Sequence, residues 1–194
     1  SSDVKSGVAT FFGGLNNSRF LNDVATQYMR GSSVSTGFAS SGNNVQDTSS
    51  PPKSNPSTNS ILNEVLKEYP NPSATAIYFV FTSNFPRGVN YCAWHSWGTA
   101  PNGTKIQFAY MPNTGGVRGC DPGNTYGTPT DSQDLRSLVN VVSHEYMETL
   151  TDAQGSAWYD AGGSEIGDKC AWQFRGPVVL GGHAWQLQQE WSNQ

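Results

Sequence analysis

One short segment of the chain carries side chains whose types and spacing suit metal-assisted hydrolysis. Residues 143–148 read Ser-His-Glu-Tyr-Met-Glu. In a helix, residues four apart lie on one face, so His144 and Glu148 would point at the same place. The pattern is one letter away from H-E-x-x-H, in which two side chains hold zinc and the intervening Glu activates water. We therefore expect His144 and Glu148 to be zinc ligands and Glu145 to be the general base.

A zinc site that keeps an open water position needs a third protein ligand. Acidic residues are dense after the motif, at Asp152, Asp160, Glu165 and Asp168. Glu165 and Asp168 follow a Gly-Gly turn that would let the chain fold across the helix face, and we expect one of them, preferably Glu165, to complete the site. Asp152 lies at the helix end, where a cap or a hydrogen bond that orients His144 suits it better.

Three other side chains are candidates for donating a hydrogen bond to a developing oxyanion. His95 lies in a predicted strand with two tryptophans, Tyr159 follows the motif helix, and His183 follows Gly181-Gly182. A histidine in an aromatic strand is more often a hydrogen-bonded structural residue than a ligand. His95 and His183 are also possible third ligands, and the sequence does not place them.

The ligand types leave more than one cation open. Two carboxylate ligands make zinc less electrophilic than a site with two histidines, so a bound water would be less acidic. A Ca²⁺ site or a purely structural metal site therefore competes with catalytic Zn²⁺.

Composition bounds the class of protein. The 194 residues are most simply one domain, and charged residues make up only 13% while small polar residues and six Trp are abundant, which is typical of a secreted protein. A net charge of −4 with eleven Lys and Arg argues against a nucleic-acid partner. No run of about 18 apolar residues is present, so no membrane span is expected. We expect a monomer.

Apolar residues recur at helical spacing in three stretches. The first, residues 8–30, is interrupted by glycine and asparagine pairs and predicts two short helices, the second capped by Ser18. The second stretch runs from Thr58 to Tyr69. The third is the motif helix, at about residues 131–150, where residues 130–133 fit the spacing of a capping box.

The remaining stretches read as strands and turns. Residues 74–82 form a nearly continuous apolar run that predicts a central strand covered on both faces. Pro101-Asn102-Gly103 between two β-rich runs predicts a hairpin. Residues 31–57 predict a long irregular surface segment, with one extended piece near 34–38. The other predicted strands are residues 91–97, 105–111, 178–180 and 184–191.

Three segments, residues 143–152, 157–160 and 165–172, together resemble a group of secreted microbial metallopeptidases that is distantly similar to the plant phosphate-induced (EXORDIUM-like) family. The likeness extends more weakly over most of the chain. The microbial members carry an H-E-x-x-E helix, whereas the plant members lack the His-Glu pair and are associated with the cell wall and growth signalling. Because His144, Glu145 and Glu148 are all present here, the resemblance favours an enzyme.

The resemblance also bears on the ends of the chain and on its cysteines. Relatives carry another strand upstream of residue 1 and a further cysteine beyond the C-terminus, which implies a processed product here. Cys92, Cys120 and Cys170 allow one disulfide and leave one thiol over. Cys92–Cys120 and Cys120–Cys170 are the expected alternatives.

Together these observations predict an α+β domain of zincin type, with a mixed sheet packed on helices. The expected function is a secreted, zinc-dependent peptidase that acts on a protein or peptide substrate. The alternative is a secreted binding module without activity, in which six Trp and eight Tyr contact cell-wall carbohydrate or protein. A metal-dependent hydrolase of another substrate class is the third possibility.

Overall fold

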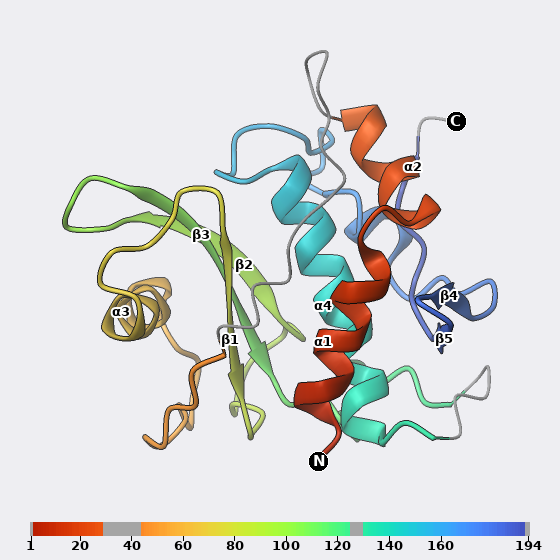
Figure 1. Cartoon of the computed structure of the whole chain (residues 1–194), viewed down its shortest axis with the longest axis horizontal. Coiled ribbons are helices and arrows are strands. Elements are labelled where there is room, and N and C mark those ends of the chain that lie inside the picture. The colour runs from red at the N-terminus through yellow and green to blue at the C-terminus, as the bar shows by residue number, and fades with distance from the viewer. Residues whose placement is uncertain (1, 29–43, 125–129, 193–194) are drawn as a thin grey trace.

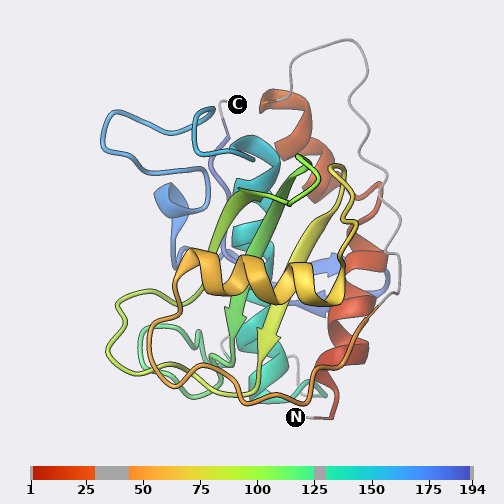
Figure 2. The same ribbon diagram turned by 90° about the vertical axis from the view of Figure 1, so that its left-hand side faces the viewer.

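The computed structural model describes residues 2–28, 44–124 and 130–192. A mixed three-stranded sheet separates two groups of helices (Figures 1 and 2). Helix α3 (Thr58–Glu68) lies across one face of the sheet. Helices α1 (Val4–Leu15) and α4 (Gln133–Thr151) lie on the other face (Figure 1). The predicted α+β class is confirmed.

The sheet contains β1 (Ile77–Thr82), β2 (Trp94–Thr99) and β3 (Lys105–Pro112). The strand order is β1-β3-β2; β1 runs parallel to β3, and β2 runs antiparallel to it. The predicted hairpin at Asn102-Gly103 is therefore confirmed. Gly103 has a φ of 85°, a left-handed conformation that glycine adopts without strain.

The predicted central position of the strand over residues 74–82 is wrong. The strand β1 lies at one edge of the sheet, and β3 is central. Helices nevertheless cover both faces of β1: Phe79 packs 5.3 Å from Phe12 of α1, while Val80 packs on the side of α3. A continuous apolar run thus indicates that both faces of a strand are buried; it does not indicate how many strands lie next to it.

Alternation along the strands divides the buried side chains into two cores. Even-numbered residues of β3, such as Phe108, face α3, and odd-numbered residues, such as Ala109, face α4 and α1. His95 of β2 is paired with Ala109 across the hairpin. Because paired residues share a face, this register directs His95 toward α4.

The N-terminal stretch forms two helices, α1 and α2 (Arg19–Tyr28), as predicted. The predicted cap is confirmed, because the Ser18 hydroxyl accepts a hydrogen bond of 3.1 Å from a backbone N–H of α2. Contrary to expectation, α1 continues through its two glycines. A Cβ at Gly14 would lie 2.6 Å from the carbonyl carbon of Leu180, so this glycine permits close packing and does not end the helix.

The other two helices begin at serine caps. The helix α3 matches its predicted range, and the side chain of Ser57 accepts a hydrogen bond from the N–H of Ser60. The predicted capping box at residues 130–133 is wrong: α4 is capped by Ser132, whose Oγ accepts from the N–H of Leu135. The position that a box needs for Glu or Gln is occupied by leucine, and the partner of Ser132 comes from elsewhere.

That partner is Asp3. Its carboxylate accepts hydrogen bonds from the N–H of Ser132, at 2.8 Å, and from the Ser132 hydroxyl, at 2.7 Å. The contact also places negative charge at the N-terminus of α4, where the helix dipole favours it. The first residues of the chain therefore fix the start of the helix that carries the motif.

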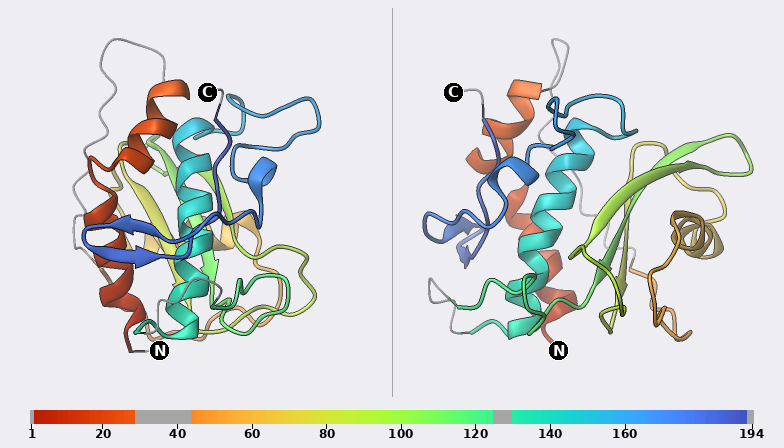
Figure 3. Two further views of the ribbon diagram at one scale, coloured as in Figure 1. Left: turned by 90° about the vertical axis from the view of Figure 1, so that its right-hand side faces the viewer. Right: turned by 180° about the vertical axis from the view of Figure 1, so that it is seen from behind.

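The C-terminal part packs on the far side of α4. Strands β4 (Val178–Leu180) and β5 (His183–Trp185) form a hairpin that crosses α4 and α1 (Figure 3). The predicted strand over 184–191 is too long, because its ladder ends at Trp185. Beyond it, Gln188 donates its N–H to the side chain of Asn140 on α4, at 2.8 Å. The segment is thus held by this side chain and by the backbone carbonyls of Gln173 and Ile166, which accept from the N–H groups of Gln189 and Trp191, and not by a strand ladder.

Several remaining predictions concern loops and cysteines. Cys92 and Cys120 form the disulfide, which confirms one of the two expected pairs, and Cys170 is a free thiol. Residues 44–57 follow an irregular path near the surface, where Ser54 forms an isolated bridge with Arg87. The extended piece expected at 34–38 lies outside the described residues. Among the described residues, no helix is long and apolar enough to cross a membrane.

The contact between Asp3 and Ser132 yields a first prediction. Asp3→Ala should lower the free energy of unfolding by about 2 kcal/mol, because it removes two charge-assisted hydrogen bonds at a helix start. Urea unfolding followed by circular dichroism measures this. Asp23→Ala is the matched control, since among the described residues the Asp23 carboxylate pairs with exposed Arg19, and the substitution should change stability by less than about 0.5 kcal/mol. Equal effects of the two substitutions would contradict the assignment.

Candidate metal centre

Side chains from four segments meet at the C-terminal half of α4. The helix supplies His144, Glu145 and Glu148, and β2 supplies His95. The loop of residues 165–168, which leads into the short helix η1 (Asp168–Cys170), supplies two acids. The fourth segment is the C-terminal one, residues 186–191, which runs beside α4 (Figure 3). We call this group of side chains the acid–histidine cluster.

The first half of the cluster contains His144, Glu148 and Asp168. The Nε2 atom of His144 lies 3.1 Å from Oε1 of Glu148 and 3.7 Å from Oδ1 of Asp168. One donor atom from each of the three lies within 4.8 Å of the other two. Zinc bonds of about 2.0–2.2 Å at tetrahedral angles place ligand atoms roughly 3.3–3.6 Å apart. The spacing of these three donors therefore fits a shared zinc ion.

The second half of the cluster is built around His95. Its Nδ1 atom lies 3.0 Å from Oε2 of Glu145 and 3.6 Å from Oε2 of Glu148. Its Nε2 atom lies 3.8 Å from Oε1 of Glu165. Of the two acids expected as third ligand, Asp168 is thus grouped with His144, and the preferred one, Glu165, is grouped with His95.

The loop can reach this position because residue 167 is glycine. A Cβ at Gly167 would lie 2.8 Å from Nδ1 of His144 and 3.0 Å from Oε1 of Glu148, too close for any other residue. The approach lets the N–H of Asp168 donate to Oε1 of Glu148 at 3.2 Å. The loop therefore both delivers Asp168 and stabilises the charge of Glu148.

Gln188, which the sequence analysis missed, contacts the other side of the His144 ring. Its amide nitrogen lies 2.7 Å from Nδ1 of His144 and 3.1 Å from the carbonyl oxygen of Gly167. With an amide N–H donated to Nδ1, the ring is neutral and its proton lies on Nε2, directed at Glu148. A charged ring, or a ring that binds a metal through Nε2, carries a proton on Nδ1 and requires the opposite amide orientation, in which the oxygen of Gln188 accepts a hydrogen bond from the Nδ1–H.

Glu190 is the second residue that the sequence analysis missed. Both of its carboxylate oxygens are buried and have no hydrogen-bond partner in the part of the chain that the structure describes, although the residue as a whole is partly exposed. Burial raises its pKa well above the usual range, and the charge of His144 only partly offsets this, because Glu148, Glu145 and Asp168 repel it. A buried acid without partners is costly unless it holds a proton or faces a cation.

The two imidazoles respond to the same excess of acid. Burial opposes a charge on His144, but its hydrogen bond to Glu148 and the charges of Glu145, Glu148 and Glu190 raise its pKa to about 10. Burial likewise opposes a charge on His95, and the hydrogen bond and charge of Glu145 outweigh it, so this pKa is also raised. Without a cation, the surrounding acids therefore favour the protonated form of both histidines.

The acids themselves are harder to ionise than usual. Burial raises the pKa of Glu148, although the hydrogen bond to His144 acts in the opposite direction. Burial and the nearby charge of Glu148 raise the pKa of Glu165 to about 7. Bound cations and bound protons therefore compete for the same oxygens, which is the property expected of a metal-binding cluster.

The donor set also bears on which metal fits. Calcium takes six to eight oxygen ligands and no imidazole nitrogen, whereas zinc accepts imidazole and carboxylate together. The cluster contains two imidazoles, and its buried Glu190 oxygens and Oε1 of Glu165 accept no hydrogen bond from the described residues. These residues fit Zn²⁺ better than Ca²⁺.

The other candidates lie apart from the cluster. Asp152 caps the end of α4 and accepts hydrogen bonds from the N–H groups of Ser156 and Ala157. His183 pairs with Asp131 at 2.9 Å. Tyr159 is 53% exposed, and no hydrogen bond or ion pair within the described ranges joins it to the cluster. Neither His183 nor Tyr159 is therefore brought to the motif.

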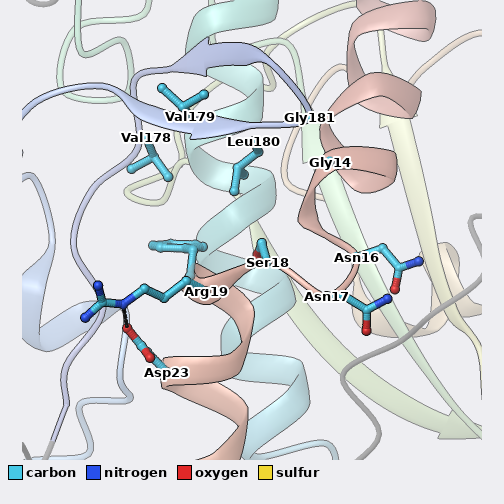
Figure 4. Close-up of a pocket in the computed structure, with 11 residues that line it drawn as sticks. Gly14, Asn16, Asn17, Ser18, Arg19, Asp23, Val178, Val179, Leu180 and Gly181 are labelled. Atoms are coloured by element: carbon cyan, nitrogen blue, oxygen red, sulfur yellow. Dashed lines mark hydrogen bonds and ion pairs between the residues drawn. The ribbon is translucent and has the colours of Figure 1, made fainter.

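Two surface cavities border different parts of the fold. A cavity of about 520 Å³ is bordered by His95 together with Tyr91, Trp94 and residues 55–58. Tyr91 and Trp94 pack on the α3 side of the sheet, whereas the cluster lies on the α4 side, so this cavity meets the cluster at His95 alone. A second cavity, of about 550 Å³, lies between the α1–α2 turn and β4 (Figure 4). It contains the ion pair of Arg19 and Asp23 but no residue of the acid–histidine cluster.

Comparisons of the chain with models of protein families, with characterised proteins and with solved structures gave no match.

The buried carboxylate of Glu190 yields the second prediction. In metal-free protein, the unfolded chain releases the Glu190 proton above pH 4.5, the ordinary pKa, while the folded chain retains it. Folding stability should therefore fall as pH rises from there toward the raised pKa. Glu190→Gln cannot titrate and should make this fall shallower at pH values above 4.5.

Urea unfolding in the presence of a chelator measures the slope. Asp23→Asn, which alters an exposed acid of α2, is the matched control and should keep the wild-type slope. An unchanged slope for Glu190→Gln would show that this carboxylate is not buried in the folded protein.

Proposed function

We propose that the protein is a secreted zinc-dependent peptidase of zincin type. The observation that carries the proposal is the convergence of His144, Glu148 and Asp168 on one point, with Glu145 beside it and His95 opposite. The helix that carries the motif packs beneath a sheet whose antiparallel edge strand, β2, supplies His95. This packing of the motif helix against an antiparallel edge strand supports the proposed zincin type.

In this proposal, His144, Glu148 and Asp168 hold the zinc ion. When bound, zinc would polarise the scissile carbonyl and lower the pKa of a water molecule. Glu145 accepts the proton of the attacking water and passes it to the leaving amine. Its position one residue after His144 and its low exposure, 7% for the side chain, keep its carboxylate next to the ligands and largely out of bulk water.

His95 has two roles open to it beside Glu145. Its hydrogen bond of 3.0 Å orients the Glu145 carboxylate, and a protonated ring would donate to an oxyanion that forms beside it. Its raised pKa favours the protonated ring that such a donor needs. Tyr159, which the sequence offered for this role, has no part in the mechanism.

The position of β2 supports a peptide as the substrate. Edge strands leave backbone groups on their outer side that can pair with an extended chain. The cavity of about 520 Å³ that His95 borders, with Tyr91 and Trp94 in its wall on the α3 side of β2, would take a side chain of such a peptide that points away from the cluster. Secretion is supported by the Cys92–Cys120 disulfide, since disulfides persist in oxidising compartments.

The binding-module alternative depends on aromatic side chains at the surface. Trp185 is 1% exposed, and Trp94 and Trp158 pack against the two cores, so these three are explained as structural. Of the exposed tryptophans, Trp97 is covered by the ammonium group of Lys105. No observation favours an aromatic platform over the peptidase.

The third prediction tests the general base. In protein reconstituted with one equivalent of zinc, Glu145→Gln should lower kcat for cleavage of an unfolded protein substrate by at least about 100-fold. The zinc content should stay at one equivalent, since Glu145 is not among its ligands. His144→Ala should instead lose both zinc and cleavage. Elemental analysis and a gel-based assay measure the two quantities.

The control is His183→Ala, which removes the one histidine that lies outside the cluster and should change neither quantity. Wild-type cleavage by Glu145→Gln, or cleavage that survives a chelator, would contradict the proposed function.

A further inference from the structure

The two oxygens of the Glu148 carboxylate face different histidines. Oε1 lies 3.1 Å from Nε2 of His144, whereas Oε2 lies 3.6 Å from Nδ1 of His95. A carboxylate that presents one oxygen to each of two donor sets has the geometry of a bridge between two cations, which in such sites lie about 3.5–4 Å apart. The side chain is 4% exposed, so the bridge position is fixed by packing.

The His95 side has the donors for a second ion. Nδ1 of His95, one oxygen of Glu145 and one of Glu148 lie within 4.8 Å of one another. The opposite ring nitrogen, Nε2, faces Glu165 at 3.8 Å. Nδ1 donates to Glu145 here, so a metal at Nδ1 would move the ring proton to Nε2, the nitrogen that faces Glu165. These three donors therefore match the His144 set in number, type and spacing.

The cluster holds more acid than one divalent ion can neutralise. With all five carboxylates ionised and both imidazoles neutral, the net charge is −5, which one Zn²⁺ reduces to −3 and a second ion reduces to −1. The two buried oxygens of Glu190, which have no hydrogen-bond partner among the described residues, are an independent sign that positive charge beyond the histidines belongs here, because buried acids are paired or bind metals.

We infer that Glu148 bridges two cation sites, and that the second, formed by His95, Glu145 and Glu148, is a regulatory site for Zn²⁺ or a similar transition metal. This inference rests on the proposed function of the first site. An ion at the second site occupies the lone pair with which Glu145 accepts a proton and the nitrogen through which His95 contacts Glu145. The ion that fills the first site activates the protein, and the ion that fills the second inhibits it.

The dependence of cleavage on zinc follows from this arrangement. Cleavage should rise as the first equivalent binds and fall as the second binds. Removing a general base costs about 10²–10⁴ in rate, so saturation of the second site should lower cleavage by at least about 100-fold. The second site should also lose zinc as pH falls, because protons compete for the same donors.

Metal stoichiometry tests the inference without relying on activity. The full chain, stripped of metal, is dialysed against zinc and analysed for bound metal. Wild type should hold two equivalents, and His95→Ala and Glu145→Gln should each hold one. His183→Ala, the control, should hold two, and circular dichroism verifies that every variant is folded. Two variants on different elements, β2 and α4, guard against the failure of one to fold.

Each outcome separates the two proposals. One equivalent in wild type, or two in both His95→Ala and Glu145→Gln, overturns the second site and leaves the proposed peptidase standing. Two equivalents with no cleavage at any zinc concentration overturns the peptidase and retains the bridged pair. No bound zinc overturns both.

Discussion

Glu148 is buried at the end of α4 with an imidazole on each side of its carboxylate, and most of the structure around it serves to make that burial tolerable. A buried charge costs several kcal/mol unless hydrogen bonds and opposite charge compensate it. The N–H of Asp168 provides one such bond, and only the absence of a side chain at Gly167 lets the loop come close enough to provide it. The register of β2 places His95 beside this carboxylate, and the C-terminal segment places Gln188 beside His144.

The features that sequence predicted well are those that depend on residues close together in the chain. The four-residue spacing of His144 and Glu148 holds whatever the rest of the fold does, because helix geometry alone sets it. The turn at Asn102-Gly103 is likewise a local property, and it carries the hairpin that directs His95 toward α4. The motif, its helix and the hairpin could therefore be read directly from the residues.

The features that sequence missed depend on contacts between distant segments. Glu190 and Gln188 reach the cluster because the backbone of Gln188 is hydrogen-bonded to Asn140 on α4. No pattern of neighbouring residues in the sequence predicts this contact. The choice between Glu165 and Asp168 depends on how a loop turns over a glycine. The edge position of β1 was hidden for a related reason, since helices on both sides give an edge strand the composition of a central one.

The disulfide has a consequence for how the protein must be produced. Cys92 lies just ahead of β2 and of His95, and the carbonyl of its partner, Cys120, accepts a hydrogen bond from Ser137 on α4. The bond is thus a brace between the two elements that face each other across the cluster. The third thiol, Cys170, ends the short helix that begins at Asp168. Oxidation with the wrong partner would pull on that helix and leave β2 unbraced, so correct thiol selection is a condition for assembling the cluster.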